Sequence, residues 1–143
     1  MDLLDVNVLV NAFRRDAPDH QAFAKYLQGL VNGSEPFAIP SLSFSGLLRI
    51  VTHPRIFDPP NAIEDALKFV EQLRTQPHCL TIVPSGRHWE IFTDLCRKGN
   101  ARGNLTSDAY LAATAIEIGA ELVTTDRGFG RWPGLRWRHP LDA

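Results

Sequence analysis

The stretch Leu3-Leu4-Asp5-Val6-Asn7-Val8-Leu9-Val10 places a single acid inside an apolar run near the start of the chain. Leucine and valine dominate it, so it predicts a buried strand that continues into a helix. An ionised carboxylate in such a place is strongly unfavourable unless a cation or several hydrogen bonds compensate its lost hydration. Asp5 is therefore the first candidate for a functional residue.

The composition is that of an ordinary globular protein. The chain has 143 residues, which suits one domain, and we expect a single domain over residues 1–143. The net charge of −1 shows no global basicity, so nucleic-acid binding requires a local group of Lys and Arg side chains. Cys79 and Cys96 lack the spacing of a metal site and are expected to be buried free thiols.

Nothing in the sequence predicts association with a membrane. The N-terminus has no basic segment followed by a long apolar one, as a secretory signal would have. No apolar stretch approaches the roughly 20 residues that are needed to span a bilayer. We therefore expect a cytoplasmic protein.

Segments typical of strands and of helices alternate along the chain. Short aliphatic runs predict further strands at residues 37–40, 80–83, 122–124 and 135–137. Apolar residues at helical spacing predict helices at residues 7–13, 16–30, 41–51, 62–75, 88–98 and 107–118. Ser41, Ser85 and Thr106 are expected to cap helices, and Gly119 to end one. The alternation predicts an α/β fold with three layers, α/β/α, around a mostly parallel central sheet.

Two further acids lie in positions like that of Asp5. Asp108 enters an alanine-rich helix, and Asp126 follows the strand predicted at 122–124. Because ligands bind beyond the carboxyl ends of parallel strands, the three acids are expected to meet at one edge of the sheet. Carboxylates gathered in one cleft repel each other, and Mg²⁺ or Mn²⁺ would relieve that repulsion through the oxygen ligands that these ions prefer. This arrangement favours metal-assisted hydrolysis.

Each acid also has a purely structural interpretation. Asp5 is suited to cap the following helix, Asp108 is favourable near the positive end of a helix dipole, and Asp126 is a common turn former. Neutral neighbours are accessory candidates with the same ambiguity. Asn7 and Asn104 either orient a water or carboxylate or end local turns. Thr124 either holds a hydroxyl near the metal-bound water or phosphate or is a strand residue.

Several other enzyme classes lack their chemical parts in this sequence. The histidines lack zinc-ligand spacing, and there is no nucleophile elbow, P-loop or dinucleotide-binding glycine motif. A phosphatase that uses Asp5 as its nucleophile would need a second acid at Asn7. These absences disfavour nucleophilic hydrolases, kinases, oxidoreductases and such phosphatases.

The arrangement of acids resembles that of the PIN-domain ribonucleases, and closely that of the VapC-type toxins of bacterial toxin–antitoxin pairs. The similarity is carried by residues 3–10, 103–113 and 119–129 and by the C-terminal residues 134–141, so it spans nearly the whole chain. It implies a PIN-like fold and a Mg²⁺-dependent endoribonuclease that cuts structured RNA such as tRNA or rRNA. It also implies a homodimer that a cognate VapB-type antitoxin inhibits. Metal binding and catalysis are thereby assigned to Asp5, Asp108 and Asp126.

Two positions depart from the family's pattern. Most PIN domains carry a Glu early in the third helix, where Gly46 stands in this chain and no carboxylate occurs from residue 37 through 52. A further Asp often follows the equivalent of Asp126 by two residues, and that position is Gly128. The site therefore either holds one metal well and a second one poorly or needs substrate to complete it. A non-catalytic PIN-like module that binds RNA or a partner is the alternative function.

Basic residues gather at residues 97–102 and again at residues 127–138, where Trp132 and Trp137 alternate with arginines. Arginines beside aromatic rings suit phosphate contact and base stacking. The candidate contacts to RNA, or to an acidic antitoxin segment, are Arg102, Arg127 and Arg131. The alternative is a solvated charged edge with the tryptophans packed in the core.

Overall fold

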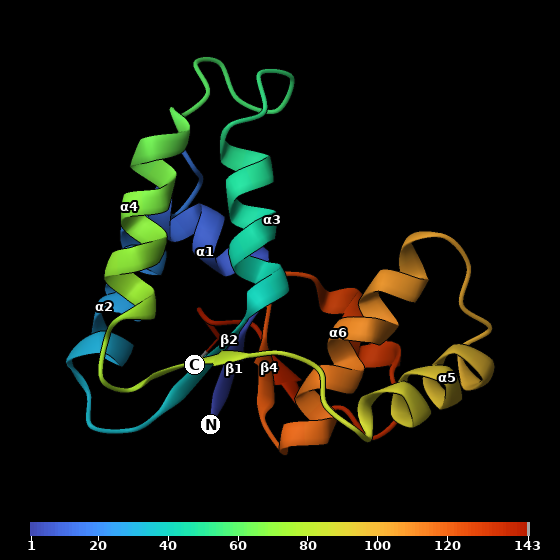
Figure 1. Cartoon of the computed structure of the whole chain (residues 1–143). Helices are drawn as coiled ribbons and strands as arrows, with labels where there is room; N and C mark the ends of the chain where they lie inside the picture. The colour runs from blue at the N-terminus through green and yellow to red at the C-terminus, as the bar shows by residue number, and fades with distance from the viewer. Residues whose placement is uncertain (143) are drawn as a thin grey trace.

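The computed structural model describes residues 1–142 and contains one five-stranded sheet (Figure 1). The strands are β1 (Asp2–Leu4), β2 (Phe37–Pro40), β3 (Cys79–Ile82), β4 (Glu121–Val123) and β5 (Trp137–Arg138). Their order is β3-β2-β1-β4-β5, and every neighbouring pair is parallel. The predicted α/β fold with helices on both faces of a parallel sheet is confirmed.

The helices divide between the two faces of the sheet. One face carries α1 (Val6–Phe13), α2 (His20–Asn32), α3 (Ser41–Val51) and α4 (Ile63–Arg74). The other carries α5 (His88–Lys98), α6 (Asn104–Ile118) and the short 3₁₀ helix η1 (Arg127–Arg131). In Figure 1, α3 and α4 stand side by side and are joined at the end farthest from the sheet, while α5 and α6 form a second pair across from them.

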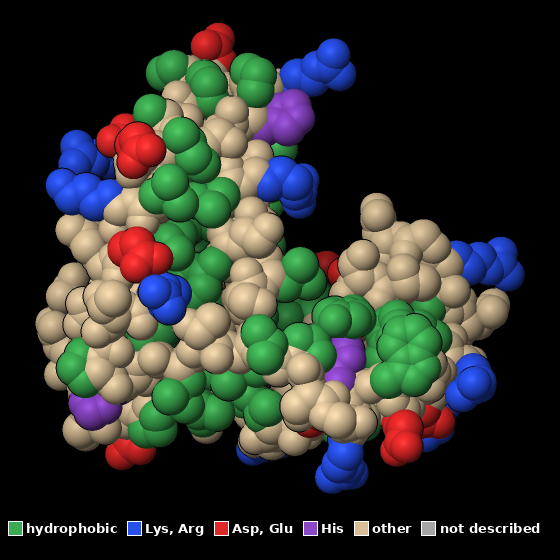
Figure 2. Space-filling view, viewed as in Figure 1, with side chains coloured by type: hydrophobic (Ala, Val, Ile, Leu, Met, Phe, Trp, Pro, Cys, Tyr) green, Lys and Arg blue, Asp and Glu red, His purple; other side chains and the backbone are tan. Residues whose placement is uncertain are grey.

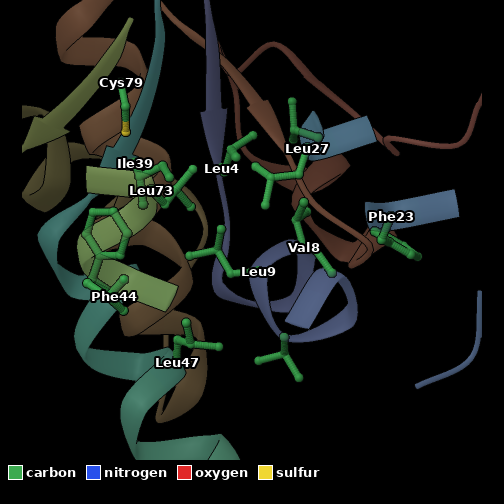
Figure 3. Packing of buried hydrophobic residues seen from close by; sticks show 14 of the residues in the cluster. Leu4, Val8, Leu9, Phe23, Leu27, Ile39, Phe44, Leu47, Leu73 and Cys79 are labelled. Carbon is green, nitrogen blue, oxygen red and sulfur yellow. The ribbon is translucent and has the colours of Figure 1, made fainter. Parts of the chain in front are cut away.

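The central strands β1, β2 and β4 are buried on both faces, which explains their continuous apolar runs. Successive side chains of a strand point to opposite faces. Leu3 and Leu122 therefore pack under α6, whereas Leu4 and Val123 belong to the core beneath α1 to α4. Figure 3 shows Leu4 packed near Val8, Leu9 and Leu27 in the core beneath α1 to α4. The strand β1 is thus held from both sides, and the residue that follows it is fixed at the carboxyl edge of the sheet.

The predicted helix caps were wrong in three places. Ser41 is the first residue of α3, and Thr106 lies inside α6, where its hydroxyl donates to the carbonyl of Gly103. Ser85 precedes α5 without capping it, because the carboxylate of Glu117 accepts the backbone N–H groups of Ser85 and Arg87. The hydroxyl of Ser85 also donates to Glu117, and no side chain caps α5. Gly119 does end α6, with a φ of 68°.

Several element bounds also differ from those predicted. Helix α6 begins at Asn104, three residues before the predicted start, because Gly103 turns the chain with a φ of 54°. The last strand is Trp137–Arg138 rather than residues 135–137. Both cysteines are free, as expected, but Cys96 is only partly buried. Among residues 1–142, no helix is long and apolar enough to cross a bilayer.

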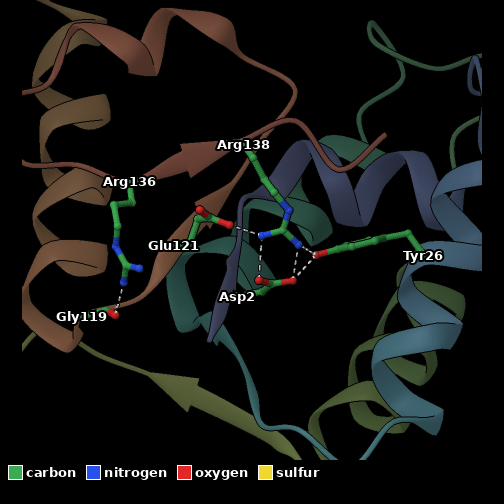
Figure 4. A network of polar contacts seen from close by, with 6 residues as sticks. All are labelled: Asp2, Tyr26, Gly119, Glu121, Arg136 and Arg138. Atoms are coloured by element: carbon green, nitrogen blue, oxygen red, sulfur yellow. Dashed lines mark hydrogen bonds and ion pairs between the residues drawn. The ribbon is translucent and has the colours of Figure 1, made fainter. Parts of the chain in front are cut away.

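A network of charged side chains joins the first residues of β1 and β4 to Arg138, the last residue of β5 (Figure 4). Arg138 donates two hydrogen bonds to Asp2, at 2.8 and 2.7 Å, and a third to Glu121. The Tyr26 hydroxyl of α2 also donates to Asp2, at 2.7 Å. Asp2 is thus neutralised within the protein.

Candidate metal centre

Asp5 is held in place by the strand before it and the helix after it. Its backbone N–H donates to the carbonyl of Val123 at 3.0 Å, which continues the pairing of β1 with β4. Its Oδ1 accepts the backbone N–H of Val6 at 2.7 Å and caps α1. The structural interpretation of Asp5 as a cap is therefore correct. It uses one of about two acceptor positions on Oδ1, so it does not exclude a ligand on the same oxygen.

Thr124 joins the first acid to the third. Its side chain is fully buried, and its hydroxyl donates to Asp5 Oδ2 at 2.7 Å. The same hydroxyl accepts the backbone N–H of Asp126 at 3.1 Å and the side-chain amide of Asn7 at 3.2 Å. Asn7 also donates to Asp5 Oδ2, and its own oxygen accepts the N–H of Thr125. Thr124 and Asn7 therefore position the acids, and the Thr124 hydroxyl points at a carboxylate rather than into open space.

The three acids line one cleft of about 630 Å³. Asp108 lies in the second turn of α6, and no hydrogen bond holds its carboxylate within residues 1–142. Asp126 caps η1, with Oδ1 accepting the N–H of Gly128 at 2.8 Å. The predicted accessory residues Asn7 and Asn104 line the same cleft. In Figure 2 the molecule is hollowed between the α3–α4 pair and the α5–α6 pair, and acidic side chains show at the floor of the hollow.

The electrostatics of the cleft disfavour three ionised acids. Burial raises the pKa of the Asp5 carboxyl, and the charge of Asp126 adds to the rise, while the hydrogen bond from Thr124 opposes it. Burial also raises the pKa of Asp108, the charges of Asp126 and Asp5 raise it further, and Arg131 opposes them. The three carboxylates therefore act on one another, as acids that share a site must. A cation in the cleft would relieve this repulsion.

The donor set fits a hard divalent cation. Carboxylate oxygens are the ligands that Mg²⁺ and Mn²⁺ prefer, and the cleft offers them from three separate segments. In the part of the chain that the structure describes, no three acidic, histidine or cysteine side chains already surround a single point. Two of the acids instead accept backbone N–H groups. Asp126 is exposed and Asp108 is partly exposed, so both side chains have room to turn towards an ion.

The wall of the cleft formed by α3 carries no acid. A Cβ on Gly46 would lie 3.2 Å from Cγ2 of Val6, so the glycine allows α3 to pack closely against α1. Ser43 donates its hydroxyl to the carbonyl of Leu4 at 3.1 Å and is buried. Ser45 and Arg49 line the cleft from the same wall. Arg49 was missed in the sequence, although its spacing of three residues from Gly46 places both on one side of a helix.

None of the three predicted basic contacts lines the cleft itself. Arg131 donates to the carbonyl of Gly99 at 3.3 Å, and its charge reaches Asp108. Arg127 pairs with Asp142 at 3.0 Å on the surface. Arg102 is exposed.

The predicted aromatic surface is not there in full. Trp132 is only 3% exposed and belongs to the core under α6, so it cannot stack on a base. Trp137 is partly buried against the same core. For Trp132 the alternative interpretation, a tryptophan packed in the core beside a charged edge, is the correct one.

Comparisons with known proteins agree with this fold. The family model described as PIN domain matches residues 3–135. VapC ribonuclease Mb2897 of Mycobacterium bovis is 42% identical to this chain, over 98% of this chain and 95% of its own length. Ribonuclease VapC25 of Mycobacterium tuberculosis is 39% identical over 98% and 99%, respectively. In the crystal structure of VapBC2 from Rickettsia felis bound to a DNA fragment from their promoter, one chain aligns with a TM-score of 0.68 and 25% identity, covering 96% of this chain and 97% of that one.

Proposed function

Because the chain belongs to the PIN-domain family, with VapC ribonucleases as its relatives, we propose that it is a Mg²⁺-dependent endoribonuclease toxin. Asp5, Asp108 and Asp126 hold the ion in this proposal. The observation that carries it is the shared cleft, which three acids from distant parts of the sequence line. Burial and the charge of Asp126 raise the pKa values of Asp5 and Asp108 there. Mn²⁺ has the same ligand preference and is expected to substitute.

The proposed reaction is hydrolysis of a phosphodiester in RNA. The oxygen of a water molecule bonds to phosphorus, the bond from phosphorus to the 3′ oxygen breaks, and that oxygen takes up a proton. The products are a 5′-phosphate and a 3′-hydroxyl. A bound divalent ion supplies two things to such a reaction, a lowered pKa for water and neutralisation of the phosphate charge.

The protein's own residues prepare the site. The hydroxyl of Thr124 and the amide of Asn7 fix Asp5 Oδ2, while the N–H of Val6 fixes Oδ1. Because the Thr124 hydroxyl also accepts the backbone N–H of Asp126, it fixes the position of Asp126 relative to Asp5. Hydrogen-bond partners that hold a ligand in this way typically matter about 10–100-fold for metal affinity or activity.

The proposed substrate is structured RNA such as tRNA or rRNA, and the proposed protein partner is a VapB-type antitoxin. The relatives named above are called ribonucleases, and the Rickettsia felis structure with which this chain aligns is of VapBC2. We also propose a homodimer. Leu42, Val83 and Trp89 are 58%, 62% and 66% exposed, which is unusual for large apolar side chains and supports a surface that another copy covers.

A second function, a non-catalytic module that binds RNA or a partner, is favoured by one observation. The α3 wall of the cleft has Gly46 where most of the family has an acid. Such a module would bind RNA at full strength without cutting it in the presence of Mg²⁺ or Mn²⁺.

One experiment separates the two functions. RNA 5′ ends are sequenced after brief induction of the wild type beside Asp5→Ala in a bacterial host. The nuclease is expected to create new 5′-phosphate ends and arrest growth, and Asp5→Ala to do neither while its circular dichroism spectrum stays unchanged. Ends that persist in Asp5→Ala, or cleavage by purified protein that is undiminished in EDTA, would overturn the proposed metal site.

A further inference from the structure

We propose that Arg49 binds a phosphate of the RNA in the cleft, on the wall where the family's usual acid is absent. The proposal rests on the proposed function and adds to it a residue that receives the substrate. Arg49 lies on α3, and it lines the same cleft of about 630 Å³ as Asp5, Asp108 and Asp126. The acids and the arginine therefore face one shared space.

The guanidinium of Arg49 is not used to hold the fold together. Its side chain is exposed, and within residues 1–142 it makes no hydrogen bond and no ion pair. Some arginines are engaged in the fold, as Arg127 is with Asp142 and Arg138 with Asp2. Others, such as Arg15 and Arg102, are also unpaired among residues 1–142, but they do not line the acidic cleft. Removing Arg49 is thus expected to leave the fold intact, and its position in the cleft, rather than its lack of a partner alone, points to a role with a ligand.

Arg49 does not neutralise the three acids either. An ion pair requires a nitrogen–oxygen distance of about 4 Å or less, and Arg49 makes none with Asp5, Asp108 or Asp126. Among the causes that shift the pKa of Asp108, the arginine that acts is Arg131. The cleft therefore has a negative floor and a separate positive wall with space between them. An anion that is bound by a cation on one side and by an arginine on the other suits that space.

Phosphate is the anion that suits the space between the acidic floor and the Arg49 wall. The planar guanidinium presents forked N–H donors that match two phosphate oxygens, and it keeps its charge at every physiological pH. Ser45, one turn earlier on α3, lines the same wall with a hydroxyl. The volume lies within the range of about 300–1,000 Å³ for small-molecule sites, so a phosphate and part of its nucleotide can enter.

The absence of an acid at position 46 and the lack of an ion-pair partner for Arg49 are connected. A Glu at position 46 would stand three residues before Arg49, the spacing at which opposite charges pair on a helix. Gly46 leaves that position empty, and no other carboxylate occurs from residue 37 through 52. The guanidinium of Arg49 is therefore available to an incoming phosphate, whereas in a chain with the acid it would have a partner already.

The test measures binding and metal separately. The probe is a fluorescein-labelled RNA hairpin, whose binding is followed by anisotropy in EDTA over a range of salt concentrations, with intactness checked on a gel. Four proteins are compared: wild type, Arg49→Ala, Arg49→Lys and Arg15→Ala. Arg15 is the matched control because it is exposed, lines a different hollow and has the same charge.

Arg49→Ala is expected to bind the hairpin about tenfold more weakly, with the slope of log Kd against log salt reduced by about 0.7–0.9, the loss of one phosphate contact. Arg49→Lys should keep the salt slope and recover part of the affinity, because it keeps the charge and loses the fork. Arg15→Ala should match the wild type. Wild-type affinity and slope in Arg49→Ala, or an equal loss in Arg15→Ala, overturns the proposal.

A second measurement keeps this result apart from the proposed function. The rise in melting temperature that Mg²⁺ causes is compared between the wild type and Arg49→Ala, and it should be the same in both. A wild type that shows no such rise and cuts no RNA contradicts the nuclease, whatever Arg49 does to RNA binding. A lost rise in Arg49→Ala alone would assign Arg49 to the metal site and overturn its role as a phosphate contact.

Discussion

Two aspartates at the two ends of the same three-residue strand have opposite surroundings. Asp2 begins β1 and meets Arg138 and the hydroxyl of Tyr26 (Figure 4). Asp5 follows β1 and meets only neutral donors and other acids. Burial raises the pKa of both carboxyls, but the hydrogen bonds and charge of Arg138 outweigh it at Asp2, whose pKa is lowered, while the pKa of Asp5 stays raised.

We propose that the difference separates a carboxylate that stabilises the fold, Asp2, from one that serves a ligand, Asp5. At Asp2 the cation is part of the protein, so the acid is satisfied when the chain has folded. At Asp5 the protein supplies hydrogen bonds that orient the carboxylate but no cation that neutralises it. A buried charge that is oriented and left without a counter-charge marks a functional site. The predictions that follow test this contrast.

The largest expected effect is on catalysis. Asp5→Asn should lower the rate of RNA cleavage by more than about 100-fold, because it removes a ligand charge that nothing else replaces. Asp2→Asn should leave the rate within about twofold, because neither Asp2 nor its partner Arg138 lines the cleft. Both rates are measured with purified protein and excess RNA. Equal losses in the two variants would remove the contrast between the acids.

The second prediction concerns the metal. Mg²⁺ at about 100 times its Kd should stabilise the wild type by about 2.7 kcal/mol, because only the folded protein brings the three acids together. The shift is read from melting curves with and without the ion. It should be retained in Asp2→Asn and lost in Asp5→Asn. An undiminished shift in Asp5→Asn would place the ion elsewhere.

A third prediction tests the orientation of Asp5. Thr124→Val should lower cleavage about 10–100-fold, because it removes the hydroxyl that joins Asp5 Oδ2 to the N–H of Asp126. Thr125→Val is the matched control. The bond from Thr125 to Asn7 comes from its backbone N–H and survives the change. Similar rates in the two variants would show that the hydroxyl of Thr124 has no particular role.

The smallest effect is expected on stability. Asp2→Asn should lower the free energy of unfolding by about 1–2 kcal/mol at neutral pH, since it weakens partly exposed charged hydrogen bonds to Arg138. The pKa of Asp2 is lower in the folded than in the unfolded protein. Its contribution to the free energy of unfolding is therefore complete at pH values above 3.8, the ordinary pKa of an aspartate, and is lost as the pH falls below that value. Denaturant unfolding of the wild type and the variant should therefore converge in acid. A constant difference down to the lowest pH would assign the loss to packing.

Local patterns predicted the strand–helix alternation because each element's signal lies within a few residues. The run before Asp5 predicted both the buried strand and the helix that the acid caps. Helix caps were less predictable. Ser85 has the right chemistry for a cap, but Glu117, 32 residues away, accepts the N–H groups near the start of α5. A local pattern contains no information on such a distant acceptor.

The site shows the same division. The three acids could be selected from the sequence because Asp5 and Asp126 follow strands and Asp108 lies near the start of a helix. The parallel order of β1 and β4 then brings Asp5 and Asp126 to one edge. The sequence could not predict that Arg49 lacks an ion-pair partner among residues 1–142, because this depends on which carboxylates lie close to it in the folded chain. Trp132 could not be assigned to core or surface either, because burial under α6 depends on how η1 packs.

The amino-acid sequence by itself determined the order of strands and helices and the parallel sheet, and it predicted the three candidate acids that line one cleft. Periodicity and strand-end position are local properties, and family resemblance added the expected chemistry. Only the tertiary structure decided that Asp2 has a cation and Asp5 has none, that Thr124 joins two of the acids, and that Arg49 faces them. Each of these depends on contacts between residues far apart in the chain, and electrostatic interactions are set by distance in space and not by separation in sequence.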